Sequence, residues 1–242
     1  MSNKAVIFGA TSLIAEHTAR LLAAEGWELV LVGRHRDALH AVASHLRLTG
    51  CAPIHELLGD AVNTDALPKL VDSARQLLGH LDLALIAWGC YHPNPDARQS
   101  REMAQINYVA SAALAELLGR VFAQQHSGTL AVISSVAGDV RRSDNYAYGS
   151  TKAALTAYLQ GLRQTLSPCG VNVLTIKPGR VETPLTAGIL RSRFSVEPAT
   201  IAAGICRAIQ RRKRVVYLPG YLRAVFFVLR SLPEWLLKRL RF

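Results

Sequence analysis

The sequence is poor in cysteine, in acidic residues and in long apolar runs, and each shortage excludes a class of protein. Its four cysteines, Cys51, Cys90, Cys169 and Cys206, are widely spaced and include no Cys-x-x-Cys pair, so we expect reduced thiols rather than a disulfide framework or a bound metal. The longest fully apolar run near the C-terminus, Ala224–Leu229, is far shorter than a membrane span. The sequence also contains no internal repeat and no low-complexity tract.

Acidic residues are outnumbered, with 17 Asp and Glu against 28 Lys and Arg, and the excess lies at one end. Residues 207–242 hold ten basic residues and one acidic residue, a net charge of +9, whereas residues 1–206 hold eighteen against sixteen, a net charge of +2. A basic run such as Arg211–Arg214 is usually a solvated face, and no recognition motif accompanies it. Nucleic acid is therefore not an expected partner.

Half of the 242 residues are hydrophobic, which suits one domain with a large core. Apolar runs alternate with helical patterns along the chain. The predicted strands are Lys4–Phe8, Glu28–Val32, Pro53–Leu58, Asp82–Trp88, Leu130–Ser135, Val171–Ile176 and Val215–Leu218. The helices predicted between them include Arg98–Gln124 and a helix at about Pro198–Gln210. This alternation predicts an α/β fold, a Rossmann-type doubly wound parallel sheet of about seven strands with helices on both faces. Because residues 1–10 are predicted to form a strand and a turn, we expect no signal peptide. The widely spaced, reduced cysteines lead us to expect a cytoplasmic protein.

The segment from Ser135 to Lys152 contains the side chains most suited to catalysis. Tyr148 and Lys152 are four residues apart, so on a helix they lie on one face, one turn apart. A nearby ammonium is expected to lower a tyrosine pKa from ~10 by about 1–3 units, which would make Tyr148 a general acid/base. Ser135 ends a predicted buried strand, where its hydroxyl can donate to a substrate oxygen. The alternative is a structural pair, because this spacing is common on helices.

A second site is predicted where the first strand meets the first helix. The segment Gly9–Ala15 forms a small-residue turn at a helix N-terminus, which favours a pyrophosphate group. After the second strand, no acidic residue is present to bind a ribose 2′-hydroxyl, and Arg34 instead offers a guanidinium to a 2′-phosphate. These features indicate NADP(H), with an ordinary solvated arginine as the alternative reading of Arg34.

Taken together, these motifs resemble the short-chain dehydrogenase/reductase family over nearly all of residues 4–220. The turn GATSLIA is similar to the family's TGxxxGxG segment, and YGSTK carries its YxxxK motif. Further matches are Asp60, Gly89, Asn107, ISSVAG at Ile133–Gly138 and KPGRVET at Lys177–Thr183. The sequence departs from the family pattern at Phe8, Leu13, Ala15 and Ile86–Trp88.

The resemblance implies hydride transfer between NADP(H) and a carbonyl/alcohol pair. It implies that Tyr148 donates a proton, that Ser135 donates a hydrogen bond to the carbonyl oxygen, and that Lys152 holds the nicotinamide ribose. Asn107 would position a water molecule for proton resupply. The implied catalytic residues are thus Ser135, Tyr148, Lys152 and Asn107. The expected cofactor-binding residues are Gly9, Thr11, Ser12, Leu13, Ile14, Arg34, Asp60, Ala61, Gly89, Tyr148, Lys152, Pro178, Gly179, Val181 and Thr183.

Residues 221–242 are predicted to form a tail distinct from the body at residues 1–220. The tail combines aromatic, aliphatic and basic residues, as in amphipathic helices that lie on an anionic membrane surface. Such a tail would make the protein peripheral on the inner face of the membrane. The alternative is packing on the body or on a neighbouring subunit of a homo-oligomer, a dimer or tetramer. The segment between Pro184 and Pro198 is too short for a long lid, which favours an open site.

The body and tail also resemble one branch of the family, the keto-reductases that complete 2′-epimerisation of decaprenylphosphoryl ribose. The substrate expected from this resemblance is a keto-sugar on a polyprenyl phosphate. Two alternatives remain: a soluble NADPH-dependent reductase of small ketones or 3-oxoacyl groups, and a catalytically silent NADP-sensing scaffold or regulator. The second alternative is motivated by Leu13 and by the missing amides at Ile86–Trp88.

Overall fold

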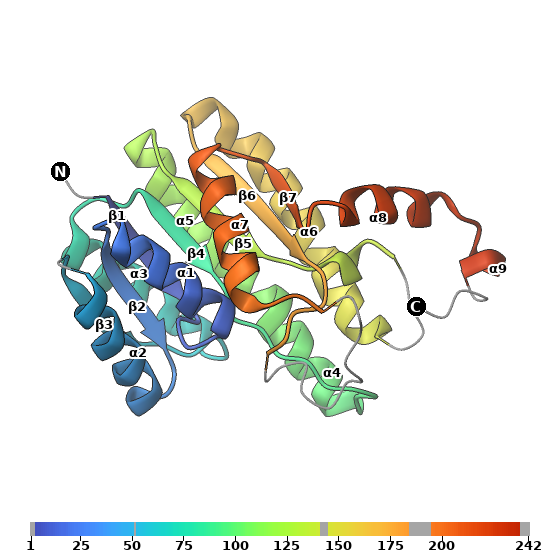
Figure 1. Ribbon diagram of the computed structural model, residues 1–242, viewed down its shortest axis with the longest axis horizontal. Coiled ribbons are helices and arrows are strands. Elements are labelled where there is room, and N and C mark those ends of the chain that lie inside the picture. The colour runs from blue at the N-terminus through green and yellow to red at the C-terminus, as the bar shows by residue number, and fades with distance from the viewer. Residues whose placement is uncertain (1–2, 51, 141–144, 184–194, 238–242) are drawn as a thin grey trace.

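One parallel sheet organises the chain, with the strand order β3-β2-β1-β4-β5-β6-β7 (Figure 1). The computed structural model describes residues 3–50, 52–140, 145–183 and 195–237. The strands are β1 Lys4–Phe8, β2 Glu28–Gly33, β3 Ile54–Leu58, β4 Leu83–Ile86, β5 Thr129–Ile133, β6 Asn172–Pro178 and β7 Val215–Leu218. The predicted doubly wound sheet is therefore confirmed.

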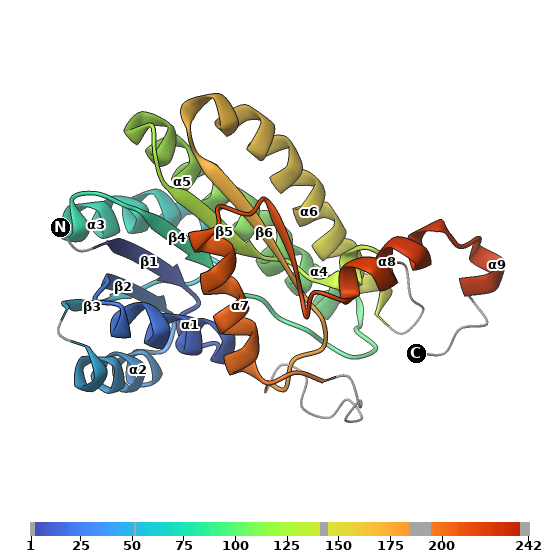
Figure 2. The same cartoon turned by 45° about the horizontal axis from the view of Figure 1, so that its top comes forward.

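Helices cover both faces of the sheet because its strands are apolar on both faces (Figures 1 and 2). In β1, Ala5 and Ile7 belong to one core, whereas Val6 and Phe8 belong to the other. The first core is closed by α1 Leu13–Ala24, α2 Arg36–Thr49 and α7 Pro198–Gln210. The second core is closed by α3 Leu67–Leu78, α5 Ser111–Gln125 and α6 Tyr146–Leu166.

The strand order reverses between β1 and β4, and this reversal positions the site. Phe8 of β1 is in register with Val32 of β2 on one side and with Ile86 of β4 on the other. The segments that follow β1 and β4 therefore separate to opposite sides of the sheet at its carboxyl edge. Ligands of doubly wound folds bind in the crevice formed at such a point.

Several predicted elements end differently at this edge: β4 ends at Ile86 rather than at Trp88, and β6 continues to Pro178 rather than ending at Ile176. Two further differences concern predicted catalytic residues. The single predicted helix Arg98–Gln124 is instead α4 Ala97–Ala104, a π-helical turn η2 Gln105–Ala110 and α5. Strand β5 ends at Ile133, before Ser135, because the Ser135 hydroxyl accepts a hydrogen bond from Ala137 N at 3.1 Å and begins the 3₁₀ turn η3 Val136–Gly138. Both differences fall on predicted site residues, Asn107 and Ser135.

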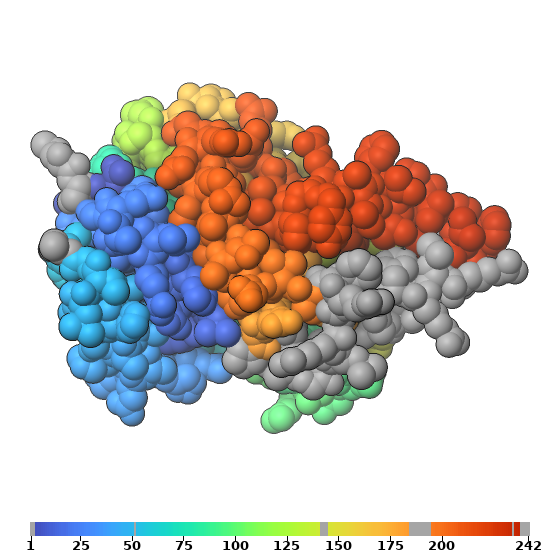
Figure 3. All heavy atoms as spheres, in the orientation of Figure 1, coloured from blue at the N-terminus to red at the C-terminus, as the bar shows by residue number. Residues whose placement is uncertain are grey.

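The C-terminal tail is helical, as predicted, and extends from one end of the body (Figures 1 to 3). It consists of α8 Leu222–Ser231 and α9 Glu234–Leu237. Phe226 of α8 is buried, whereas Phe227 is 75% exposed and Trp235 of α9 is 61% exposed. The end of the tail, residues 238–242, and most of the predicted short lid, residues 184–194, lie outside the described residues.

Among the described residues, the helical stretch Ala97–Gln125 is the one long and apolar enough to cross a membrane. Its most apolar window is 61% buried inside the protein, and this burial favours a core helix.

Candidate active site

Tyr148, Ser135 and Lys152 meet at the carboxyl edge of the sheet. Tyr148 and Lys152 lie in the first two turns of α6, and the Lys152 Nζ is 5.8 Å from the centre of the Tyr148 ring. The Tyr148 hydroxyl is hydrogen-bonded to the Ser135 side chain. The structure therefore brings together the three predicted side chains from two separate elements.

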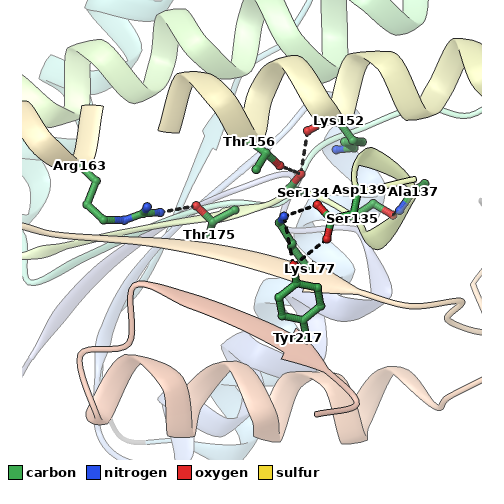
Figure 4. A network of polar contacts seen from close by, with 10 residues as sticks. All are labelled: Ser134, Ser135, Ala137, Asp139, Lys152, Thr156, Arg163, Thr175, Lys177 and Tyr217. Carbon is green, nitrogen blue, oxygen red and sulfur yellow. Dashed lines mark hydrogen bonds and ion pairs between the residues drawn. The ribbon is translucent and has the colours of Figure 1, made fainter. Parts of the chain in front are cut away.

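The turn that carries Ser135 packs directly on the backbone of α6. A side chain at Gly138 would place its Cβ 2.7 Å from Ala153 N, so only glycine permits this approach. Ser134 strengthens the junction by donating to the Lys152 carbonyl at 3.1 Å and by sharing a 2.8 Å hydrogen bond with Thr156 (Figure 4). These contacts hold Ser135 opposite the first turn of α6.

Burial, rather than the charge of Lys152, has the largest effect on the pKa of Tyr148. Desolvation raises the pKa of Tyr148 to about 12, and the hydrogen bond from Ser135 opposes this shift only in part. The prediction that Lys152 lowers this pKa is therefore wrong for the protein alone. Burial also lowers the pKa of Lys152 to about 8, and its ammonium is engaged by the Ile133 carbonyl at 3.2 Å.

Asn107 lies in the π-helical turn and joins the segment after β4 to α6. Its Oδ1 accepts from Cys90 N at 2.9 Å, and its Nδ2 donates to the Cys90 carbonyl at 2.9 Å and to Thr151 Oγ1 at 3.3 Å. Thr151 in turn donates to the Tyr148 carbonyl at 2.7 Å. Gly89 lies against the Asn107 amide and the Lys152 ammonium. The buried Asn107 is thus a clamp on the predicted site, and its water-positioning role remains a prediction.

The turn between β1 and α1 has the shape that an anionic group needs. Gly9 has a φ of +78°, and a Cβ there would lie 2.7 Å from Trp88 N. Ser12 caps α1 by accepting from Ala15 N at 3.4 Å. Within the described chain, the amides of Leu13 and Ile14 have no hydrogen-bond acceptor, as expected of a first helical turn. They are available to a pyrophosphate despite the Leu13 side chain.

Arg34 follows the end of β2 beside this turn. Thr11 packs against Gly33, so the turn and the residue before Arg34 are neighbours. The exposed Arg34 has no ion-pair partner among the described residues, and its charge is felt by the Cys90 thiol across the crevice. Asp60 is exposed and accepts from Val62 N at 3.0 Å, while the adjacent Ala61 is buried.

The remaining predicted cofactor residues follow β6. Pro178 ends the strand, and Gly179 N donates to the Leu218 carbonyl at 2.9 Å. Val181 is buried in a bridge to Val196, and Thr183 is partly buried. A side chain on Gly179 would meet Leu222, the first residue of α8, so the tail begins against this segment.

Sequence reasoning missed two residues beside Tyr148. The Tyr91 ring packs edge-on against the Tyr148 ring, with centroids 5.3 Å apart, and burial raises the pKa of the Cys90 thiol to about 11. Their position directly after Gly89 was the available signal. Ligand atoms of Cys90, His92 and Glu102 lie within 4.8 Å of one another, and His92 already hydrogen-bonds Glu102 at 3.1 Å. We assign no metal to this cluster.

Comparison with known proteins finds relatives that are all described as dehydrogenases or oxidoreductases. A family model described as short chain dehydrogenase matches residues 3–193. An uncharacterised oxidoreductase of Mycobacterium tuberculosis is 36% identical over 239 residues, covering 97% of this chain and 96% of the relative. Another from Streptomyces coelicolor is 35% identical over 244 residues, covering 97% and 94%.

Solved structures give the same result. A short-chain dehydrogenase from Sphingobium yanoikuyae, in complex with NADPH, superposes with a TM-score of 0.85 at 25% identity, covering 99% of this chain and 96% of that one. Levodione reductase superposes with a TM-score of 0.84 at 20% identity, covering 92% and 98%. The second likeness concerns the fold alone.

Proposed function

Because the chain belongs to the short-chain dehydrogenase/reductase family and is therefore an oxidoreductase, we propose that it uses NADP(H) to reduce a ketone to a secondary alcohol. The observation that carries the proposal is the hydrogen bond between Tyr148 and Ser135, with the Lys152 ammonium 5.8 Å from the same ring. A proton donor, a second hydrogen-bond donor and a positive charge then surround one point at the carboxyl edge of the sheet.

Tyr148 is the proposed proton donor. With a pKa of about 12, its phenol remains protonated at neutral pH, as an acid in the reductive direction requires. Ser135 is held by Ala137 N and turned toward the Tyr148 hydroxyl, so a carbonyl oxygen between them would receive two hydrogen bonds. These bonds strengthen as negative charge develops on that oxygen.

The residues of the crevice fit a dinucleotide. The Gly9 turn and the amides of Leu13 and Ile14 suit its pyrophosphate. Lys152 lies near Gly89 and the Tyr148 ring, where its ammonium would hold the nicotinamide ribose. When bound, the cofactor supplies the hydride. The protein supplies orientation, through the Asn107 clamp, and the proton.

Two observations support NADP(H) over NAD(H). The residue after β2 is Arg34, whose planar guanidinium suits a 2′-phosphate, and no carboxylate is bonded to it in the described part of the chain. The Sphingobium relative was solved in complex with NADPH.

We propose a lipid-linked carbonyl compound, a keto-sugar on a polyprenyl phosphate, as the substrate. This proposal is supported by the tail at residues 221–242, whose α8 exposes Phe227 and Val228 beside basic residues. The tail would hold the body, residues 1–220, on an anionic membrane surface in the cytoplasm, and the protein would act as a homo-oligomer.

The substitution Tyr148→Phe tests the enzymatic proposal. We expect kcat to fall by about 10²–10⁴-fold, the usual contribution of a general acid, while NADPH still binds. Tyr158→Phe is the matched control, because Tyr158 also lies on α6 but donates to Glu116 at 2.9 Å. Turnover by Tyr148→Phe at the unmodified rate would refute the proposal and favour the NADP-sensing scaffold.

A further inference from the structure

A groove of about 450 Å³ lies beside the candidate active site, between α6 and the strands β6 and β7. One face of α6 forms one wall, and side chains that alternate along the strands form the other (Figure 4). Arg230 of α8 also lines it. Its size falls within the range of about 300–1,000 Å³ that is typical of small-molecule sites. Neither Tyr148 nor Lys152 lines the groove.

The groove is positively charged. Among the residues that the structure describes, its lining includes three cationic side chains, Arg163, Lys177 and Arg230, and one acidic side chain, Asp139. Asp139 is already paired with Lys177. The two guanidinium groups therefore have no counter-charge among the described lining residues.

Arg163 is the more informative of the two arginines because it is half-buried. Its Nε donates to the Val173 carbonyl at 2.9 Å and its Nη2 to Thr175 Oγ1 at 2.6 Å, and both acceptors are neutral (Figure 4 shows the second bond). No carboxylate lies within ion-pair distance of Arg163 in the described ranges. Burial and the charge of Arg214 both lower the pKa of Arg163, so its cation is disfavoured where it lies. A counter-ion would stabilise this partly buried charge.

Arg230 connects the groove to the tail. Its side chain is hydrogen-bonded to the Tyr217 hydroxyl, which in turn donates to Asp139 Oδ2 at 2.7 Å. The guanidinium therefore lies beside Tyr217 at the groove, and the Arg230 side chain is exposed. The exposed Phe227 and Val228 lie on the same helix, three and two residues before Arg230.

We propose that this groove binds a phosphate-bearing molecule, whose charge balances the guanidinium groups of Arg163 and Arg230. Guanidinium groups bind phosphate through paired, charge-assisted hydrogen bonds, and the groove has room for a group of sugar size beside the phosphate. The phosphate has two possible sources, a soluble metabolite or a lipid headgroup at the membrane surface. The proposal does not depend on the reductase activity, since the groove uses none of its catalytic side chains.

The test is a calorimetric titration of ribose 5-phosphate, and of inorganic phosphate, into protein saturated with NADPH. The cofactor occupies the nucleotide crevice, so further binding reports a separate site. The same titration in Arg34→Ala protein, which lacks the guanidinium proposed for the 2′-phosphate of the cofactor, separates phosphate binding at Arg34 from phosphate binding in the groove. We expect saturable binding that Arg163→Gln and Arg230→Gln each weaken about tenfold or more, the loss of one charge-assisted hydrogen bond. Arg230 is exposed, so its variant is informative even where Arg163→Gln unfolds.

Matched controls are Arg120→Gln, on an exposed face of α5, and Arg223→Gln, which is exposed on α8 but does not line the groove. A parallel flotation arm uses phosphatidylcholine vesicles with and without phosphatidylglycerol. If Arg230→Gln, but not Arg223→Gln, weakens the binding of ribose 5-phosphate, the ligand is a soluble metabolite. If Arg230→Gln, but not Arg223→Gln, weakens the binding to vesicles, the ligand is a lipid headgroup. The proposal is overturned if neither arm shows binding, or if the groove variants bind as tightly as the controls.

Discussion

The ammonium of Lys177 pairs with the carboxylate of Asp139, and this ion pair joins strand β6 to the loop that carries Ser135 (Figure 4). The two side chains are 5% and 4% exposed, so the pair is buried. Tyr217 of β7 completes the cluster by donating to Asp139 at 2.7 Å. Asp139 follows Ser135 by four residues, and Lys177 precedes Pro178 of the proposed cofactor site. The pair thus holds the two sides of the candidate site together.

Removing one partner of this pair is expected to be strongly destabilising. Lys177→Met leaves the Asp139 carboxylate buried without a counter-charge, which typically costs about 3–5 kcal/mol. The free energy of unfolding, measured by urea denaturation, should fall by that amount. Lys213→Met, an exposed substitution, should have little effect.

A double variant separates charge from packing at this site. Adding Asp139→Asn to Lys177→Met removes the unpaired charge and should recover part of the lost free energy of unfolding. An equal or larger loss in the double variant would mean that the pair stabilises the protein through contacts other than charge.

The affinity for NADPH should depend on pH through Lys152. Burial lowers the pKa of Lys152 to about 8, whereas Tyr148, at about 12, stays protonated. The ammonium therefore predominates below pH ~8, and each further pH unit reduces its population about tenfold. We expect NADPH to bind more weakly as the pH rises through this region, measured by fluorescence titration. Lys152→Arg keeps its charge and should show a flat profile; a decline of equal size in that variant would assign the titration to another group.

Arg34 should determine cofactor choice. The unmodified protein is expected to bind NADPH more tightly than NADH, and Arg34→Ala should reduce the affinity for NADPH about tenfold or more while leaving NADH unchanged. Arg36→Ala, a neighbouring exposed arginine at the start of α2, is the matched control. Comparable affinities of the unmodified protein for both cofactors would contradict the reading of the segment after β2.

The exposed face of α8 should be required for membrane association. Phe227→Glu and Val228→Glu place charge on side chains that are 75% and 57% exposed, so folding should be preserved while flotation with anionic vesicles is lost. Leu48→Glu is the control, because Leu48 is 86% exposed on α2, far along the chain from the tail. Flotation of both tail variants at the level of the control would rule out the proposed role of this face.

Much of the fold could be predicted because its signals are local. Strands β1 and β7 and helix α7 have the predicted ends, since apolar runs and a proline at the first helical position are visible in the sequence. The predicted site residues Ser135, Tyr148, Lys152 and Asn107 also lie together. The π-helical turn around Asn107 was not predictable, because it depends on the Cys90 backbone and on Thr151 of another helix.

By itself the sequence determined the alternation of strands and helices and the chemical groups available at the carboxyl edge, because period, turn chemistry and residue spacing are properties of neighbouring residues. Only the tertiary structure decided how these groups titrate and which of them pair. Desolvation of Tyr148 and Lys152, the Lys177–Asp139 ion pair and the cationic groove at Arg163 each arise where segments distant in the chain exclude water from one another. The free energy of a charged group depends on how far water is excluded from it, and this exclusion cannot be read from the order of residues in the sequence.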